Sequence, residues 1–309
     1  MNNAALLVSV ATLVAGGALT WSVLSTQQGA ALPASTEPQI TAEYGQQLIR
    51  DTSLHLGAGQ TDPAKRYAGN NLDCSSCHLE SGQKPGNLSL LQAASKYPTF
   101  SGRDGIVGDL TDRINGCMQR SMAGRRMERD NPQMQAMVLY IEQLGRQYEA
   151  MGESLRTASE PPAFVEPERA ADLEHGAAVY VERCQICHGV NGEGLKATGD
   201  IADGYLFPPL WGQDSYNIGA GMARVLTAAR FIKARMPLGN PLLSDDEAFD
   251  VAAYMNAQPR PNMENLENDY PDRTLKPVDS PYPPYADPFP VEQHRLGPYA
   301  PIRAYNNKP

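Results

Sequence analysis

Two short cysteine motifs constrain this chain more than any other feature of its sequence. They are CSSCH, which supplies Cys74, Cys77 and His78, and CQICH, which supplies Cys184, Cys187 and His188. In each motif a histidine directly follows the second of two closely spaced cysteines, which is the spacing used to attach c-type haem. The thiols form thioethers with the haem, and the histidine then reaches the iron. A zinc site does not need histidine after both pairs, and a thioredoxin-type dithiol needs a βαβ setting that is missing here. We therefore expect two covalently bound haem c groups.

The surroundings of the two motifs repeat. A stretch with apolar residues at helical spacing precedes each motif (ITAEYGQQLIRDTSLHLG and LEHGAAVYVER), and an amphipathic helix closes each unit (NPQMQAMVLYIEQLG and SDDEAFDVAAYMNAQ). The spacing from His78 to Tyr140 is close to that from His188 to Tyr254. Two copies of one small helical domain explain this pattern most economically, so the expected fold is all-α, with two tandem cytochrome c domains.

The composition changes outside these units. TASEPPAFVEPE forms a linker between them. From Pro259 onward prolines recur, so no regular helix can run for long. The many tyrosines and apolar residues there favour an extended arm packed over the domains rather than a disordered tail. We expect an N-terminal segment with its linker (1–37), a first domain with one haem (38–150), a linker (151–168), a second domain with the other haem (169–258) and a Pro-rich C-terminal arm (259–309).

The N-terminus is apolar from Ala4 to Leu24 and carries no charged side chain. This length fits a transmembrane span and also the core of a signal peptide. No Lys or Arg precedes the segment and no clear A-x-A site follows it, so an uncleaved membrane anchor and a cleaved signal peptide both stay open. In either case the rest of the chain is expected in the periplasm, soluble or tethered to the inner membrane.

The charge balance narrows the choice of partner. The net charge is −9 and the pI is near 5.1, which counts against nucleic acid and anionic membrane surfaces. An acidic surface suits a basic protein partner. The chain has five cysteines. Four of them form two closely spaced pairs and the fifth stands apart, which argues against a disulfide framework.

Each iron needs a further ligand from a residue that is distant in the sequence. In the second unit Met236 lies in KARMPLGNP, a loop bracketed by prolines between the motif and the closing helix. This is the position expected of a distal methionine, so the sequence favours Met236 opposite His188. The other candidates are Met222, Lys233, Met255 and His175.

The corresponding region of the first unit holds the fifth cysteine. If DLTDRINGCMQRSMAGR is helical, Arg113, Cys117 and Ser121 lie on one face. Further arginines follow at positions 120, 125 and 126, and Arg103 precedes them. Positive neighbours lower the pKa of a thiol and favour the thiolate, which ligates iron and acts as a nucleophile. The arginines also suggest a small anionic ligand.

Spacing leaves alternatives open for each of these side chains. A lone cysteine on a helix is commonly a small core residue. Arg113 could pair with Asp109 or Asp112, and Arg120 could hold a haem propionate. The other candidate ligands of this iron are Met118, Met122 and His55.

Together these stretches resemble the thiosulfate dehydrogenase family of dihaem c-type cytochromes. The resemblance rests on INGCMQRSM, on CSSCH and CQICH, on FPPLWGQDSYNIGAGMARVLTAARFIKARMPLG, and on the tail KPVDSPYPPYADPF…QHRLGPYAPI. It implies two all-α cytochrome c domains that oxidise two thiosulfates to tetrathionate and release two electrons. The family's catalytic haem has a His/Cys pair, which maps onto His78 and Cys117. Its active-site arginines and serine map onto Arg103, Arg113 and Ser121.

The family's second haem passes electrons outward, and its ligands map onto His188 and Met236. The implied acceptor is a small c-type cytochrome or a similar carrier, such as a high-potential iron–sulfur protein. Some members have a lysine directly before the distal methionine and exchange the two ligands on reduction. Here that position is Arg235, which stays protonated and cannot ligate iron. We therefore predict that Met236 stays bound to the iron, and Lys233 is the less favoured alternative ligand.

The charges suggest a mechanism. Because thiosulfate is a dianion, Arg103 and Arg113 are expected to neutralise and orient two copies, with Ser121 as a hydrogen-bond donor. Cys117 is expected to bond the sulfane sulfur of one thiosulfate as a nucleophile. The second thiosulfate then attacks that adduct and releases tetrathionate.

Other classes of protein stay open on sequence alone. A non-catalytic dihaem electron-transfer cytochrome would tolerate methionine in place of Cys117. A dihaem peroxidase would need an iron with an open or labile position. Another haem–thiolate sulfur-oxidation cytochrome would act on a carrier protein and would need a protein-sized docking surface. The dense arginines favour a small anion, while the direction, thiosulfate oxidation or tetrathionate reduction, stays open.

Overall fold

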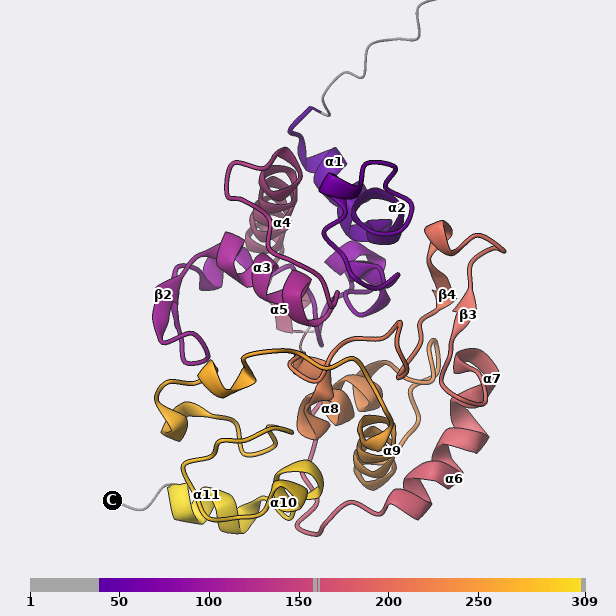
Figure 1. The fold of residues 1–309 in the computed structure, drawn as a ribbon, viewed down its shortest axis with the longest axis vertical. Helices are drawn as coiled ribbons and strands as arrows, with labels where there is room; N and C mark the ends of the chain where they lie inside the picture. The colour runs from indigo at the N-terminus through magenta and orange to yellow at the C-terminus, as the bar shows by residue number, and fades with distance from the viewer. Residues whose placement is uncertain (1–38, 158–159, 161, 307–309) are drawn as a thin grey trace, which may run out of the picture. The chain divides into compact units, whose positions relative to one another are not determined.

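Helices make up most of the regular structure, as the apolar spacing predicts. The structure, a computed structural model, describes residues 39–157, 160 and 162–306 (Figure 1). Its α-helices are α1 (Ala42–Arg50), α2 (Thr52–Leu56), α3 (Leu110–Arg120), α4 (Pro132–Ala150), α5 (Glu153–Thr157), α6 (Leu173–Arg183), α7 (Gln185–His188), α8 (Val225–Arg235), α9 (Asp245–Ala257), α10 (Val291–Leu296) and α11 (Ala300–Asn306). Two antiparallel hairpins, which the sequence did not predict, are β1 (Thr99–Ser101) with β2 (Ile106–Gly108) and β3 (Leu195–Lys196) with β4 (Tyr205–Phe207).

Each unit is built on two helices that cross at a glycine. In the first unit α1 packs against α4, and in the second α6 packs against α9. A Cβ atom on Gly45 would lie 2.0 Å from the carbonyl oxygen of Ala136, and one on Gly176 would lie 2.2 Å from that of Asp250. Backbones can approach this closely only where a side chain is missing. The predicted internal repeat is therefore a repeat of one helix crossing.

Side chains at the helix starts explain where the helices begin. Ser244 and Glu247 form a reciprocal capping box at α9, as the SDDE sequence predicts. Asp109 and Asp112 form the same arrangement at α3, the helix that carries Cys117. Their carboxylates accept hydrogen bonds from the first backbone N–H groups, so the fifth cysteine lies on a helix with a fixed start.

Each unit has its own apolar core. Methionines of α3 and α4, together with Leu48 and Leu56, fill the first core. Tyr180, Trp211 and Phe249 are among the residues of the second. Three methionines that the sequence left as iron-ligand candidates are almost fully buried in these cores: Met118, Met122 and Met255.

The C-terminal arm packs against both units, as its tyrosines and apolar residues predict. Tyr299 and Ile302 are buried in the second core. Asp269 makes an ion pair with Arg120 of the first unit. Contacts group residues 38–309 into one unit, and the domain boundaries within it stay predictions.

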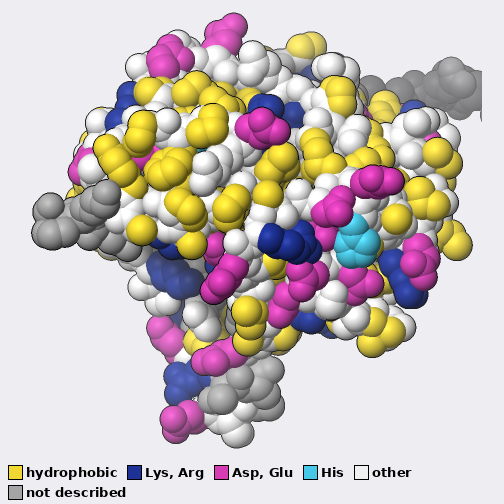
Figure 2. Space-filling view, turned by 90° about the horizontal axis from the view of Figure 1, so that it is seen from below, with side chains coloured by type: hydrophobic (Ala, Val, Ile, Leu, Met, Phe, Trp, Pro, Cys, Tyr) yellow, Lys and Arg dark blue, Asp and Glu magenta, His cyan; other side chains and the backbone are white. Residues whose placement is uncertain are grey.

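Two surface properties bear on the predicted partners. On the face drawn in Figure 2, acidic and basic side chains are interspersed and do not gather into a basic field. Within the described ranges, no helix is both long enough and apolar enough to cross a membrane. The apolar stretch from Ala4 to Leu24, on which the predictions of an anchor or a signal peptide fall, lies outside the described residues.

Candidate functional site

Cys117 lies on α3 beside a cation. Nη1 of Arg113, one turn earlier on the same face, is 2.9 Å from the Cys117 sulfur. The alternative partners of this arginine are engaged elsewhere, because Asp109 and Asp112 cap the helix and pair with Arg129. The helical spacing in the sequence therefore predicted this pair correctly.

The surroundings of Cys117 favour its thiolate. Burial alone would raise the pKa of the thiol, but neighbouring groups, first of all the charge of Arg113, lower it to about 6. The cysteines of the first motif behave in the opposite way: burial raises the pKa of Cys74 to about 12 and that of Cys77 to about 11. Cys117 is thus ionised at neutral pH, in the form that ligates iron and acts as a nucleophile.

The residues of the first motif fit a covalent haem. Cys74 and Cys77 are not joined in a disulfide, so both sulfurs can form thioethers with haem. Nδ1 of His78 lies 2.7 Å from the carbonyl oxygen of Leu88. Because a carbonyl oxygen can only accept, Nδ1 carries the proton and Nε2 keeps the lone pair that a metal needs. His78 also interacts with Cys117, so the two proposed axial ligands of this haem belong to one group of side chains.

Arg103 lies on the turn between β1 and β2, and the C-terminal arm holds it there. Tyr270 donates its backbone N–H to the carbonyl oxygen of Arg103 at 2.7 Å, and its hydroxyl lies 3.4 Å from the Arg103 Nε. Asp269 lies 4.0 Å from the same nitrogen. The charge of Arg103 opposes the rise in the pKa of Arg113 that the Cys117 thiolate causes. The two guanidinium groups are therefore close enough to repel each other, and an anion between them would relieve that repulsion.

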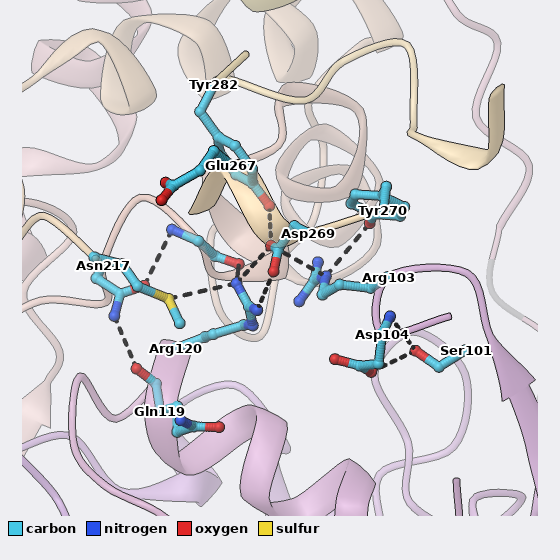
Figure 3. A network of polar contacts seen from close by, with 12 residues as sticks. Ser101, Arg103, Asp104, Gln119, Arg120, Asn217, Glu267, Asp269, Tyr270 and Tyr282 are labelled. Atoms are coloured by element: carbon cyan, nitrogen blue, oxygen red, sulfur yellow. Dashed lines mark hydrogen bonds and ion pairs between the residues drawn. The ribbon is translucent and has the colours of Figure 1, made fainter. Parts of the chain in front are cut away.

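Asp269 is the centre of a buried network that the sequence did not predict (Figure 3). Arg120 donates to both of its carboxylate oxygens, at 2.9 and 2.7 Å, and Tyr282 donates its hydroxyl at 2.6 Å. The guanidinium of Arg120 thus bonds Asp269 in this structure, and the suggestion that Arg120 holds a haem propionate stays a prediction. Lys276 lies nearby under the tyrosine rings of the arm, and burial lowers its pKa to about 8.

Ser121 and Tyr97 complete the surroundings of Cys117. Ser121 ends α3, where its carbonyl oxygen accepts a hydrogen bond from Asn70. Its role as a donor to substrate stays a prediction. Burial raises the pKa of Tyr97, and the charges of Arg113 and Cys117 also act on it, which places its hydroxyl near this group. Nothing in the stretch KYPTF points to Tyr97, because its proximity arises from folding.

The second motif has the same histidine geometry. Nδ1 of His188 lies 2.8 Å from the carbonyl oxygen of Pro208, so Nε2 is again the nitrogen that can bind a metal. Cys184 and Cys187 are not joined in a disulfide, so both sulfurs can form thioethers with haem. The glycines that follow the motif have positive φ angles, and a Cβ atom on Gly192 would lie 2.3 Å from the Trp211 ring. They are therefore needed for the turn itself and for packing on Trp211.

Met236, the favoured ligand in the second unit, is half-buried beside the second core, at the C-terminal end of α8. Met222 is also half-buried and packs against both cores. His175 is paired with Asp250, and Met255 is buried in the core. Lys233, the alternative ligand to Met236, donates to the carbonyl oxygen of Leu243 at 2.7 Å. These contacts support Met236 without testing it.

Two family models match consecutive parts of the chain. The model described as "SoxA/TsdA, cytochrome c domain" matches residues 62–149. The model described as "Cytochrome C oxidase, cbb3-type, subunit III" matches residues 171–255. Each matched range contains one CxxCH motif, so the chain has two cytochrome c domains and carries two covalently bound haem c groups, as expected.

Several characterised proteins are similar over most of this chain. A thiosulfate dehydrogenase of Stutzerimonas stutzeri is 38% identical over 74% of this chain and 70% of its own length. That of Allochromatium vinosum is 38% identical over 70% of this chain and 77% of its own length. That of Psychrobacter arcticus is 37% identical over 66% of this chain and 61% of its own length. Among solved structures, thiosulfate dehydrogenase (TsdBA) from Marichromatium purpuratum has a TM-score of 0.62 at 35% identity, covering 74% of this chain and 49% of that chain.

Proposed function

Because this chain belongs to the thiosulfate dehydrogenase family, we propose that it oxidises two thiosulfates to tetrathionate at Cys117 and passes the electrons to an external carrier. The observation that carries the proposal is the contact between Arg113 and a cysteine whose pKa is lowered to about 6. A thiolate next to paired arginines suits a nucleophile that receives a small dianion. Membership of the family supplies the identity of that dianion.

Arg113 and Arg103 bind and orient thiosulfate in this proposal. Both are guanidinium groups, which hold oxyanions through paired hydrogen bonds. The arm holds Arg103 in place through Tyr270 and Asp269. Two thiosulfate dianions repel each other. When the arginines neutralise their charges, the two sulfane sulfurs can approach.

The sulfur chemistry takes two steps. In the first, the Cys117 thiolate and the sulfane sulfur of one thiosulfate form an S–S bond and two electrons are released, which two bound haem groups would accept. In the second, the sulfane sulfur of another thiosulfate bonds the sulfane sulfur of the adduct, and the bond to Cys117 breaks. The thiolate leaves, tetrathionate is released, and no proton is consumed. The haem groups supply the redox capacity, with His78 and Cys117 as proposed ligands of one iron and His188 and Met236 of the other.

The electrons leave through the second unit in this proposal. Ile186, between the two cysteines of the second motif, is 88% exposed, whereas Ser75 and Ser76 of the first motif are half-buried. An exposed motif brings a haem edge within reach of another protein. We propose a small c-type cytochrome or a high-potential iron–sulfur protein as the acceptor, and the periplasm as the compartment.

The test is thiosulfate-dependent reduction of ferricyanide, with tetrathionate quantified, for the natural chain and for Cys117→Gly. Both proteins are first shown to carry two haems. We expect the natural chain to be active and the variant to be inactive. The reverse assay, tetrathionate reduction with a reduced dye, establishes the favoured direction.

Each other outcome supports a different protein class. Full activity in Cys117→Gly would move the chemistry away from this cysteine. Inactivity of the natural chain in both directions would favour an electron-transfer cytochrome without a substrate site. Activity only on a thiol-bearing carrier protein would favour a different haem–thiolate sulfur-oxidation cytochrome.

A further inference from the structure

Arg235 reaches from the end of α8 to the loop that follows the first haem motif. Its Nη2 donates to the carbonyl oxygens of Pro85 and Asn87, the latter at 3.2 Å. Arg235 directly precedes Met236, and Asn87 directly precedes Leu88. One side chain therefore joins the segment with the proposed ligand of the second iron to a loop of the first unit.

That loop also fixes the histidine of the first motif. The carbonyl oxygen of Leu88 accepts from His78 Nδ1 at 2.7 Å. Leu88 and Gly86 have φ angles of 57° and 95°, a conformation that the loop keeps only when its surroundings hold it. Along this route two hydrogen bonds, Arg235 to Asn87 and His78 to Leu88, connect Met236 to His78.

The carbonyl partner of a metal-bound histidine controls the orientation and basicity of the ring, and with them the properties of the metal. In haem proteins such hydrogen bonds are among the features that set the reduction potential. A contact that displaces Leu88 would thus act on the first iron without touching it. The Arg235 guanidinium is well placed to do so, since it reaches two carbonyl groups of that loop at once.

We propose that Arg235 is a positioning residue that couples the two haem sites. It holds the loop behind His78 against the end of α8 that carries Met236. A change of charge or ligation at one iron therefore alters the reduction potential of the other, and the coupling is reciprocal. The inference rests on the proposed ligands His78 and Met236, but not on the identity of the substrate.

Charge adds to the effect of geometry. Burial lowers the pKa of Arg235, and the carboxylate of Glu80 opposes this. The guanidinium stays protonated at neutral pH. A cation close to both sites favours the reduced irons, which carry one positive charge fewer. Removing it is expected to shift both sites toward the oxidised form.

The experiment is a reductive titration of the holoprotein without thiosulfate, in which each haem is followed by its absorbance. In Arg235→Leu we expect the ratio of reduced to oxidised haem at a fixed potential to fall at both sites, by about 2- to 30-fold. A second readout is hydrogen exchange at Ser89 and Leu90, whose N–H groups are bonded within the loop. Both amides are expected to exchange faster in the variant.

Arg230→Leu is the matched control. It removes the same charge from the same helix, but Arg230 packs over the ring of Phe164, at 5.6 Å. We expect its loop exchange to stay unchanged and its first haem to titrate normally. Equal shifts of the reduction potentials in Arg235→Leu and Arg230→Leu would mean that only long-range charge is at work, which would overturn the proposal. A shift confined to the second haem in Arg235→Leu would also overturn it.

Two further measurements keep the result interpretable. The near-infrared charge-transfer band of methionine-ligated ferric haem, recorded on the natural chain, tests Met236 separately from Arg235. If Arg235→Leu fails to load both haems, Arg235→Gln keeps a polar side chain without placing a lysine, which could ligate the iron, before Met236, and it is read by the same exchange experiment. Unchanged exchange in both variants would overturn the proposal, whether or not the chain oxidises thiosulfate.

Discussion

The backbone N–H of Tyr270 donates to the carbonyl oxygen of Arg103 at 2.7 Å, although the two residues are 167 positions apart in the sequence. The hydroxyl of the same tyrosine lies 3.4 Å from the Arg103 Nε, and its ring stacks beneath the guanidinium. A residue of the C-terminal arm thus sets the direction of an arginine proposed to bind substrate. In this arrangement the arm is part of the candidate site.

Tyr270→Phe tests this relationship. The variant keeps the ring and the backbone bond and loses only the hydroxyl, a loss of about 1 kcal/mol for a hydrogen bond to a charged group at this distance. We expect the KM for thiosulfate to rise about fivefold, with little change in kcat. Steady-state kinetics on the haem-loaded protein measures both. Tyr285→Phe is the control, because this arm tyrosine bonds the carbonyl oxygen of Ser280, and an equal rise there would contradict a direct effect on Arg103.

Removal of the cation beside Cys117 is expected to have a larger effect. Arg113→Met loses the charge that stabilises the thiolate and a group that binds the dianion. We expect kcat/KM for thiosulfate to fall by about 10²–10³, as for the loss of one stabilising donor. Arg126→Met is the matched control, because Arg126 is exposed and pairs with Asp112. Similar losses in the two variants would argue against a specific role for Arg113.

Replacement of Met236 separates the two haem sites. Met236→Ala is expected to abolish the near-infrared band of methionine-ligated haem and steady-state turnover. The first haem should still be reduced by thiosulfate in a single-turnover experiment, since its surroundings are unchanged. Met255→Leu, a swap of similar volume in the second core, is expected to cost less than about 1.5 kcal/mol and to keep the band. A band that survives in Met236→Ala would assign the ligand to another residue.

The pair of His175 and Asp250 predicts how stability depends on pH. Hydrogen bonding to Asp250 raises the pKa of His175, and Asp172 and Glu247 add to this. A raised pKa stabilises the folded chain below the unfolded value of about 6.5, and the contribution is lost as the pH rises through the folded value. His175→Gln is therefore expected to lower the free energy of unfolding at pH 5 and to have little effect at pH 8. The difference should stay below about 1 kcal/mol, because the side chain is 46% exposed. Denaturant titration at the two pH values measures it, and a larger loss at pH 8 would contradict the assignment.

Local features of the site could be predicted from the sequence, and distant ones could not. Each CxxCH motif places two thiols and an imidazole within five residues, so haem attachment can be recognised from the sequence alone. Arg113 and Cys117 are four positions apart on one helix, and helical geometry alone brings them together. The capped helix at Ser244 follows from an equally local pattern.

Tyr270, which bonds Arg103, and Asp269, which pairs with Arg120, lie on the arm, 167 and 149 positions away along the chain. No periodicity carries information over that distance. The sequence showed that the arm contains tyrosines and apolar residues, but not that Asp269 would accept from both Arg120 and Tyr282. For the same reason the sequence left a haem propionate as a possible partner of Arg120. The two hairpins were missed because each strand has only two or three residues.

The position of the arm in the sequence also determines when the site can become complete. Synthesis runs from the N-terminus, so both CxxCH motifs and Cys117 precede Asp269 and Tyr270 on any growing chain. Until these two residues have emerged, Arg103 lacks the contacts that orient it, although every proposed iron ligand is already made. A chain that ended before Asp269 would have both haem-binding motifs but not the contacts that orient Arg103 toward a substrate. The last fifty or so residues would therefore be the final step in assembling the proposed anion site.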